Sequence, residues 1–243
     1  MRIDQPLVEG KLVRRYKRFL TDVELPSGEV LVAHCPNTGS LLGCKEEGSP
    51  VWLRDTQDPK RKLRHSWQAV KVGETWVNVD TNLPNKVVAE ALRDRRIPGL
   101  DGYDTVRTEV KYGTNSRIDV LLEDSAGALP PCYVEVKNTT LADGGVARFP
   151  DAVTTRGLKH LGELEQVVKD GARAVQFFFV SRGDVTSFEP AGDIDPDYTA
   201  GLVSAVKGGV EVVAWSTRVL PDALELDRPL EVRVDGNVVA PLA

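Results

Sequence analysis

SRIDVLL at residues 116–122, followed after a short connection by CYVEVK at residues 132–137, decides the fold of the second half of this 243-residue chain. Side chains alternate faces along a strand, so Glu135 and Lys137 point the same way while the valines beside them turn into a core. The connection is rich in Asp, Ser, Gly and Pro, so a hairpin would bring Asp119 beside Glu135. The pattern therefore predicts two neighbouring strands that carry two carboxylates and a lysine to one place.

This cluster predicts a metal site for phosphodiester hydrolysis. One or two carboxylates with water and phosphate oxygens are enough to hold Mg²⁺ or Mn²⁺, so Asp119 and Glu135 are the candidate ligands. Lys137 would position the attacking water. For Arg117, on the strand face of Asp119, a phosphate contact and an ion pair with Glu135 are both open. The structural alternative is an edge strand that displays alternating charges to solvent.

Composition indicates an ordinary globular protein. The chain is long enough for one large or two small domains, and 41% of its residues are hydrophobic and 28% charged. It has no apolar run long enough to span a bilayer and no signal-peptide pattern at the start, so we expect a cytoplasmic protein without a membrane partner. The three cysteines form no C-x-x-C pair, and we expect reduced thiols in or near the core.

Basic residues are concentrated in the first third of the chain. The net charge is +2 over residues 1–84 and −7 over the remainder. Two basic clusters are interleaved with, or followed by, aromatic residues, the combination that nucleic-acid-binding surfaces use. A solvated loop and an edge strand protected by charge are the alternative. The candidate contacts are Arg14, Arg15, Lys17 and Arg18 in one cluster and Lys60, Arg61, Lys62 and Arg64 in the other.

The first third reads as a small β-barrel. Short apolar or alternating runs are separated by Gly- and Pro-containing turns, which favours an OB-like barrel, with a sandwich as the alternative. We place this domain at residues 1–82. The expected strands are Leu7–Arg15, Phe19–Leu25, Glu29–Cys35, Ser49–Arg54, Ser66–Val72 and Glu74–Val79.

From residue 83 to residue 243 the hydrophobic period indicates a domain of helices and a mixed sheet. The order is helix, three strands, helix, strand, helix, strand, which is typical of a restriction-endonuclease-like α/β/α core. The chain is thus predicted to be an α+β protein of two domains. After a helix that begins near Pro84, the expected elements are strands at 105–111, 117–123 and 133–138, a helix at about 152–170, a buried strand at 174–181, a helix at 197–207 and a strand at 210–215. The apolar runs near 230–234 and 238–239 fit a strand in either domain or a contact between subunits.

The helix that follows the second acid strand offers further basic residues. Arg156, Lys159 and His160 lie near its N-terminus, where main-chain amides and cations make a phosphate site. His160 by itself is more typical of a helix face than of a general base. Near His34, the segment 36–40 has residue types that suit both a phosphate cradle and a tight turn, and turn chemistry favours the turn.

Asp119 with Glu135-Val136-Lys137 resembles the PD-(D/E)XK nuclease superfamily, with Ile118 where that motif has its proline. Nearly the whole chain is similar to the sugar fermentation stimulation protein A family of bacteria and archaea. The stretches that carry this similarity are 33–40 (AHCPNTGS), 80–85 (DTNLPN) with 90–92 (EAL), 116–119 (SRID), 135–141 (EVKNTTL), 149–153 (FPDAV) and 156–161 (RGLKHL).

The resemblance implies DNA as the partner, an N-terminal OB-type barrel and a C-terminal nuclease-like domain. It also adds Glu90 to Asp119, Glu135 and Lys137 as a catalytic residue and further metal ligand. Two functions follow: a metal-dependent nuclease, and a non-catalytic DNA-binding regulator of sugar metabolism genes on a nuclease-like scaffold. Sugar binding by the barrel is a third hypothesis. Single or double strands, RNA in place of DNA, and the oligomeric state, a homodimer included, stay open at this point.

Overall fold

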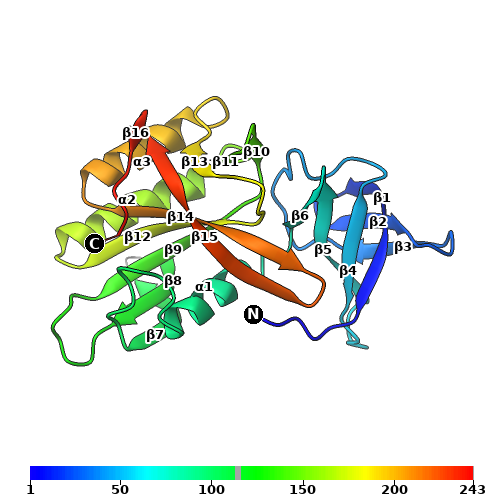
Figure 1. Ribbon diagram of the computed structural model, residues 1–243, viewed down its shortest axis with the longest axis horizontal. Helices are drawn as coiled ribbons and strands as arrows, with labels where there is room; N and C mark the ends of the chain where they lie inside the picture. The colour runs from blue at the N-terminus through cyan, green and yellow to red at the C-terminus, as the bar shows by residue number, and fades with distance from the viewer. Residues whose placement is uncertain (113–115, 243) are drawn as a thin grey trace.

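The molecule consists of two sheets, each with its own core, and the computed structural model describes residues 1–112 and 116–242. Figure 1 shows the N-terminal strands, in blue and cyan, at one end and the rest of the chain at the other. The first sheet spans Leu7 to Asn78, and the first helix beyond it begins at Pro84.

The N-terminal sheet is a closed barrel. Its strands run in the order β3-β2-β1-β4-β5-β6, and a bridge between His34 and Ser66 joins β3 to β5 and closes the ring. Leu12, Val23 and Trp67 are fully buried inside it. The OB-like barrel predicted from the spacing of the turns is therefore confirmed. The strands are β1 (Leu7–Tyr16), β2 (Leu20–Glu24), β3 (Val30–His34), β4 (Pro50–Asp55), β5 (His65–Val72) and β6 (Thr75–Asn78).

The second domain is a mixed sheet in the order β10-β11-β13-β15-β14-β12-β9-β8-β7, with β16 beside β15. Its first half contains α1 (Pro84–Arg93), β7 (Thr105–Tyr112), β8 (Ser116–Glu123), β9 (Cys132–Thr139), β10 (Ala142–Asp143), β11 (Val146–Phe149) and α2 (Thr155–Lys169). Its second half contains β12 (Arg173–Val180), β13 (Ser187–Pro190), α3 (Pro196–Lys207), β14 (Glu211–Leu220), β15 (Ala223–Val234) and β16 (Asn237–Val238).

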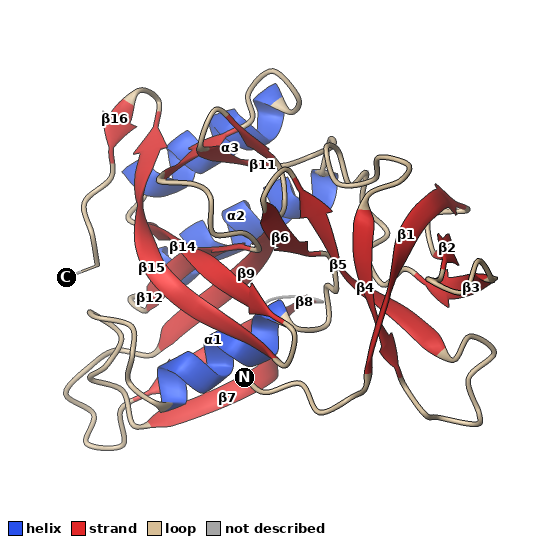
Figure 2. Cartoon of the chain, turned by 45° about the vertical axis from the view of Figure 1, so that its right-hand side comes forward, coloured by secondary structure: helices blue, strands red, loops and turns tan. Residues whose placement is uncertain are grey.

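Strand β12 shows how the layers form. It pairs in parallel with β9 at one edge and β14 at the other, so it is a central strand, and its residues on both faces are buried. Val175, Phe177 and Phe179 pack in the core that holds α1, whereas Phe178 and Val180 pack with α2 and α3. Figure 2 shows α1 on one side of these strands and α2 and α3 on the other. This is the predicted α/β/α arrangement.

The structure differs from the expected elements at several places: β10, β11 and β13 were not expected, β14 runs on to Leu220, and α2 and the C-terminal run also differ. Helix α2 begins at Thr155 because the Thr154 hydroxyl caps it, accepting a hydrogen bond from the Gly157 amide at 3.0 Å. The C-terminal run forms the long strand β15, which pairs antiparallel with β14. The choice left open by the sequence is thus settled, since this run extends the sheet of the second domain.

Polar contacts join the two domains. The Ser40 hydroxyl donates to the main-chain oxygen of Asp151 at 2.7 Å, and the Leu41 amide donates to Oδ2 of Asp151 at 2.9 Å. The Asn78 amide at the end of the barrel donates to the Ser181 carbonyl at 2.8 Å. The loop after β3 and the last barrel strand therefore both rest on the second domain.

Two simpler expectations can be compared with the structure. Cys35, Cys44 and Cys132 are all buried and free, as predicted. No helix within the described residues has the length and apolar character needed to cross a membrane.

Candidate metal and nucleic-acid site

The site begins where β8 and β9 separate. The two strands pair from Leu122 and Cys132 as far as Val120 and Val134. Beyond that point the side chain of Asp119 replaces the main chain of β8 as the partner of β9. Its Oδ2 accepts the hydrogen bond from the Val136 amide at 2.7 Å. The carboxylate thus sits in the opening between the two strands.

Helix α1 holds the other oxygen of Asp119. Nδ2 of Asn85 donates to Oδ1 of Asp119 at 2.7 Å. Asn85 lies in the first turn of α1, which starts at Pro84, so the helix start fixes the carboxylate from the side opposite β9. Both oxygens of Asp119 therefore have a defined orientation.

Glu135 lies on β9 with its side chain only 2% exposed. Its Oε1 accepts from Nζ of Lys137 at 2.6 Å and from Nδ1 of His160 on α2. Its Oε2 is buried and has no hydrogen-bond partner among the described residues. An unpartnered buried carboxylate oxygen costs free energy, so this atom is available to a ligand that the protein itself does not supply.

The hydrogen-bond network assigns the tautomer of His160. Nε of Arg156 is 3.4 Å from Nε2 of His160, and a guanidinium can only donate, so Nε2 is the acceptor and Nδ1 carries the hydrogen. Nδ1 therefore donates to Glu135. The Lys137 ammonium lies 3.2 Å from Nδ1 of His160, but both groups are donors and form no hydrogen bond with each other. The ammonium hydrogens of Lys137 that are not donated to Glu135 therefore have no partner in His160.

The pKa values of Asp119 and Glu135 are shifted in opposite directions. Burial, together with the nearby charge of Glu135, raises the pKa of Asp119 to about 6. Burial alone would also raise the pKa of Glu135, but the hydrogen bonds from His160 and Lys137 and the Lys137 charge outweigh it and lower that pKa. Neighbouring carboxyls with divergent pKa values are typical of sites that handle protons or metals.

These groups open into a polar cavity of about 470 Å³, which we call the acid hollow. Its walls come from β7, β8, β9 and the first turns of α2. It is lined by Glu109, Ser116, Arg117, Asp119, Glu135, Arg156, Lys159 and His160. The acid hollow therefore holds three acids together with three lysine or arginine side chains, the groups that bind a metal ion and a phosphate.

A divalent cation fits the donors present. Asp119 and the free Oε2 of Glu135 supply hard oxygen ligands, and Mg²⁺ usually takes the rest of its shell from water and phosphate. Within residues 1–112 and 116–242 no three His, Cys, Asp or Glu side chains are grouped closely enough to hold a metal by themselves. The protein would therefore supply two carboxylates and leave the other positions open.

Glu90 does not join Asp119 and Glu135 in the acid hollow. Its carboxylate forms a salt bridge with the Met1 ammonium at 2.9 Å and lies 3.9 Å from Arg96. It lines a separate cavity of about 710 Å³, which shares only Asp119 and Glu109 with the acid hollow. Helix α1 turns Glu90 toward the N-terminal segment, so the structure does not provide the direct metal-ligand role expected for it.

Several of the predicted nucleic-acid contacts have partners within the barrel. Arg14 pairs with Asp22 at 2.7 Å, and Arg64 pairs with Asp55 at 2.5 Å. Arg15 donates to main-chain oxygens of the segment 37–39, and Arg18 donates to the Thr38 carbonyl at 2.9 Å. The guanidinium groups of Arg15 and Arg18 thus hold the segment 36–40, which is irregular with a bend at Gly39.

The remaining basic residues of both clusters are exposed on two loops of the barrel, which leave opposite ends of the antiparallel pair β1 and β4. Lys17 lies between β1 and β2, and the run 60–62 lies between β4 and β5. In OB folds these two loops flank the face of strands 2 and 3 that takes up oligonucleotides. Here that face also exposes Phe19, Val30 and Val32. Cations beside exposed apolar side chains suit the backbone and the bases of a nucleic acid.

Comparison with known proteins now places the chain. The family model described as "Sugar fermentation stimulation protein RE domain" matches residues 82–223, and the one described as "SfsA N-terminal OB domain" matches residues 13–79. This chain belongs to the sugar fermentation stimulation protein (SfsA) family. The resemblance stated from the sequence motifs is therefore confirmed.

Individual SfsA relatives match over almost their full lengths. The sugar fermentation stimulation protein homolog of Geotalea uraniireducens is 48% identical over 96% of this chain and 100% of its own. That of Rhodospirillum rubrum is 52% identical over 89% of this chain and 92% of its own. The solved structure of Pyrococcus furiosus SfsA in complex with Ca²⁺ has a TM-score of 0.85 and 27% identity, and covers 96% of this chain and 100% of that one.

Within this SfsA chain the structure changes the expected role of His160. It is 6% exposed and its ring faces Glu135, so it is a partner of the acid and not a surface contact for nucleic acid. Arg156 and Lys159, one and four residues into α2, line the acid hollow, where Arg156 contacts His160 and Lys159 pairs with Glu163 at 3.2 Å. Arg117 also lines it, while Glu135 pairs with Lys137 and His160 instead.

Sequence reasoning missed two residues at the site. Asn85 was not among the expected site residues, yet its amide holds Asp119. Glu109 on β7 lines both cavities and has a φ of 56°, in the left-handed region that non-glycine residues rarely adopt. A glutamate in a strand gives no sequence signal of such a conformation, and the contact of Asn85 with Asp119 joins residues 34 positions apart, which no local pattern shows.

Proposed function

We propose that this SfsA protein binds DNA through its barrel and cleaves phosphodiester bonds with Mg²⁺ or Mn²⁺ held by Asp119 and Glu135. The observation that carries the proposal is the pairing of Glu135: one oxygen is fixed by Lys137 and His160, and the other is buried without a partner. Such a carboxylate is oriented for a cation before the cation arrives. The Ca²⁺ complex of the Pyrococcus furiosus relative supports a divalent ion in this family.

Three basic residues in or beside the acid hollow have tasks in this reaction. A bound Mg²⁺ or Mn²⁺ would polarise the phosphoryl oxygen and lower the pKa of a water molecule. Lys137, with one ammonium hydrogen directed at Glu135, has others with which to orient the attacking water. Arg156 and Lys159, near the N-terminus of α2, would hold the phosphates on either side of the bond that breaks.

DNA binding is assigned mainly to the exposed loops of the barrel. Lys17, Lys60, Arg61 and Lys62 would contact phosphates, and Phe19 would stack on a base. The net charge of the whole chain is −5, so the binding depends on this local concentration of cations. The association constant for DNA should then fall steeply as the salt concentration rises. Each phosphate contact should lower it by about tenfold for every tenfold increase in salt.

A second function, DNA binding without cleavage, is favoured by one observation. Glu90 is engaged by Met1, and the described residues offer no group of three protein ligands for a metal. A site with two carboxylates can bind a cation and a phosphate without turning over. Metal-dependent turnover distinguishes the two functions, and DNA binding alone does not.

The test is cleavage of labelled single-stranded, duplex and branched DNA, and of RNA, with Mg²⁺ or Mn²⁺. Glu135→Gln should lower the rate by about a hundredfold or more, because it removes a metal ligand and the charge that the Lys137 ammonium faces. DNA affinity should stay within about twofold, since the barrel loops are untouched. Glu165→Gln, the same change on α2 outside the acid hollow, serves as the matched control.

Three results are informative. Cleavage by wild type and Glu165→Gln but not by Glu135→Gln supports the nuclease. Salt-sensitive DNA binding with no cleavage by any of the three proteins supports the regulator. Absence of salt-sensitive binding to every DNA and RNA probe contradicts both functions.

A further inference from the structure

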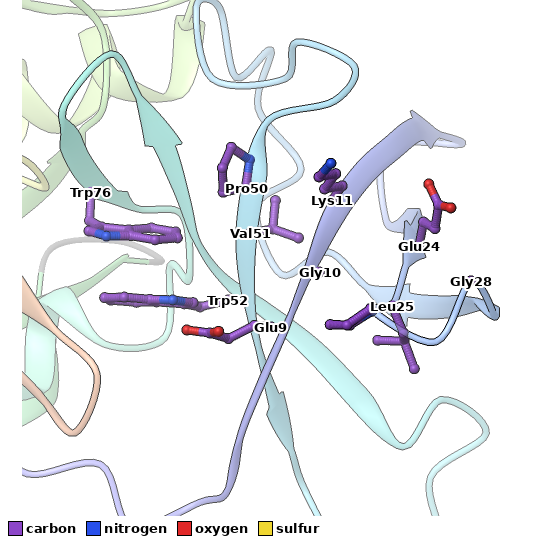
Figure 3. Close-up of a pocket in the computed structure, with 11 residues that line it drawn as sticks. Glu9, Gly10, Lys11, Glu24, Leu25, Gly28, Pro50, Val51, Trp52 and Trp76 are labelled. Atoms are coloured by element: carbon purple, nitrogen blue, oxygen red, sulfur yellow. The ribbon is translucent and has the colours of Figure 1, made fainter.

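The barrel carries a second cavity, away from the acid hollow, which we call the Trp groove. It has a volume of about 460 Å³ and lies across β1 and β4 toward the β2–β3 turn. Figure 3 shows the residues that line it, with the two tryptophans at one end and the turn at Gly28 at the other. It is lined by Glu9, Gly10, Lys11, Glu24, Leu25, Pro26, Gly28, Pro50, Val51, Trp52 and Trp76.

A stacked pair of indole rings forms the end wall of the Trp groove. Trp52 on β4 and Trp76 on β6 have ring centroids 3.7 Å apart and an interplanar angle of 17°. Their neighbours Val51, Leu53 and Val77 belong to the barrel core, so alternation along the strands turns the two rings outward. Figure 3 shows the rings lying one above the other beside the groove.

The pair is not explained by packing inside the barrel. Trp52 is 5% exposed, yet its indole Nε1 is buried without a hydrogen-bond partner among the described residues. Buried indole N–H groups usually find a partner, and an unpaired one costs free energy. Two large aromatic side chains held outward at this cost, next to a cavity, indicate a surface for a flat ligand.

Three charged side chains surround the floor of the groove. Register places Glu9 opposite Trp52, and Lys11 opposite both Pro50 and Glu24. Within the described residues, none of the three charged side chains forms a hydrogen bond or a salt bridge with another residue. Two acceptors and one donor group are therefore available beside an apolar platform.

The charges and the apolar surface of the Trp groove indicate which class of ligand fits it. Two carboxylates against one ammonium repel a phosphate chain, and the exposed cations Lys17 and the run 60–62 lie on other loops of the barrel. A pyranose ring has an apolar C–H face that stacks on an indole, and hydroxyl groups that both donate to carboxylates and accept from an ammonium. The mixture of a largely apolar wall and a few polar groups is the usual composition of a small-molecule site.

We propose that the Trp groove binds a neutral carbohydrate, with one sugar ring packed against Trp76 and its hydroxyls bonded to Glu9, Lys11 and Glu24. Trp76 is the outer, partly exposed member of the pair, and Trp52 supports it from beneath. OB-type barrels can take up oligosaccharides as well as oligonucleotides, so the fold accommodates both ligands at separate places. The proposal does not depend on the acid hollow or on DNA binding.

Titration of the full chain with neutral trisaccharides tests this inference. Maltotriose, cellotriose, mannotriose and N,N′,N″-triacetylchitotriose are added while tryptophan fluorescence and calorimetric heat are recorded. We expect a saturable response to at least one of them, changed less than about twofold between low and moderate salt because the ligand carries no charge.

Variants separate the groove from the rest of the barrel. Trp76→Ala should weaken binding by about tenfold or more, and Trp76→Phe should restore most of it, because the ring face is what matters. Glu24→Gln, which leaves the platform intact and does not threaten folding, should weaken it by about threefold to tenfold. Lys17→Ala, on the loop between β1 and β2, should have no effect on sugar and should weaken DNA binding.

The inference is overturned if none of the four sugars gives a saturable response, or if the response is the same in Trp76→Ala. It is also overturned if an oligo-dT probe or a proline-rich peptide binds through Trp76 while the sugars do not. Circular dichroism and retained DNA binding by Trp76→Ala show that the variant is folded.

Discussion

Asp119 shows how a single side chain creates the site. Its Oδ2 replaces a main-chain acceptor for the Val136 amide where β8 and β9 part, and its Oδ1 is held by Asn85. A carboxylate that satisfies a backbone amide is fixed in position without help from a metal. The cost is electrostatic, because burial and the Glu135 charge both oppose ionisation and raise the pKa of Asp119 to about 6.

This raised pKa predicts a pH-dependent contribution to stability. Between the ordinary value of 3.8 and about 6, the folded protein binds a proton at Asp119 that the unfolded chain has released. Stability from this group is therefore fully present below pH 4 and declines as pH rises toward 6, by on the order of 2 kcal/mol. Denaturation of metal-free wild type and Asp119→Ala checks this across pH 4 to 7.5.

The comparison depends on the difference between the two proteins, since other groups titrate in both. The advantage of wild type over Asp119→Ala should be larger at pH 4 than at pH 7.5. A constant difference over this range would show that the pKa of Asp119 is not raised. Adding Ca²⁺ should restore the advantage of wild type at high pH, because a cation binds the ionised carboxylate.

At the scale of elements, two glycines illustrate what positions a strand and what a helix tolerates. A Cβ on Gly10 in β1 would lie 2.4 Å from Cγ1 of Val23 and 2.8 Å from the main-chain oxygen of Glu24. Nothing lies within 4 Å of a Cβ placed on Gly162 in α2. Strand β1 therefore needs glycine to approach β2, whereas α2 has no such need.

The same substitution should consequently have opposite effects at these positions. Gly10→Ala should lower the free energy of unfolding by about 1–3 kcal/mol, because a backbone oxygen cannot move aside easily. Gly162→Ala should raise it by about 0.5–1 kcal/mol, through the better helix propensity of alanine. Urea denaturation measures both, and a neutral Gly10→Ala would mean that the barrel strands can separate without cost.

At the scale of the whole molecule, Asp151 links the two domains. Its carboxylate accepts from the Ser40 hydroxyl and the Leu41 amide, both at 2.9 Å. The loop after β3 is in turn held by Arg15 and Arg18 from the barrel. The loop after β3 therefore joins the barrel to the second domain through a polar contact region.

Removal of this contact should loosen the domains without disturbing either core. Asp151→Ala should lower stability by about 1–3 kcal/mol, since it leaves the Leu41 amide unsatisfied. Ser40→Ala in the Asp151→Ala background still removes the bond to the main-chain oxygen of residue 151, so the coupling energy in a double-mutant cycle should be at most about 1 kcal/mol. Hydrogen exchange at Leu41 should become faster, and fully additive effects would show that the two residues act separately.

The sequence by itself determined the two domains' architecture and the central pair of the site. Turn residues at short intervals predict the barrel, and alternation along β9 places Glu135 and Lys137 on one face, where they form a salt bridge at 2.6 Å. The hairpin also predicts that Asp119 lies near Glu135, and both line the acid hollow. These properties follow from the period of the strand and the length of a connection, which are local.

Tertiary structure alone decided which side chains complete or leave the site. His160 reaches Glu135 only because α2 docks on β9, and Glu90 is drawn to Met1 because the N-terminal segment lies along α1. Likewise Trp52 and Trp76 stack across strands that are not neighbours in the sheet. Such contacts join residues far apart in the chain, and their geometry is set by helix docking and sheet closure, which no local pattern of residues encodes.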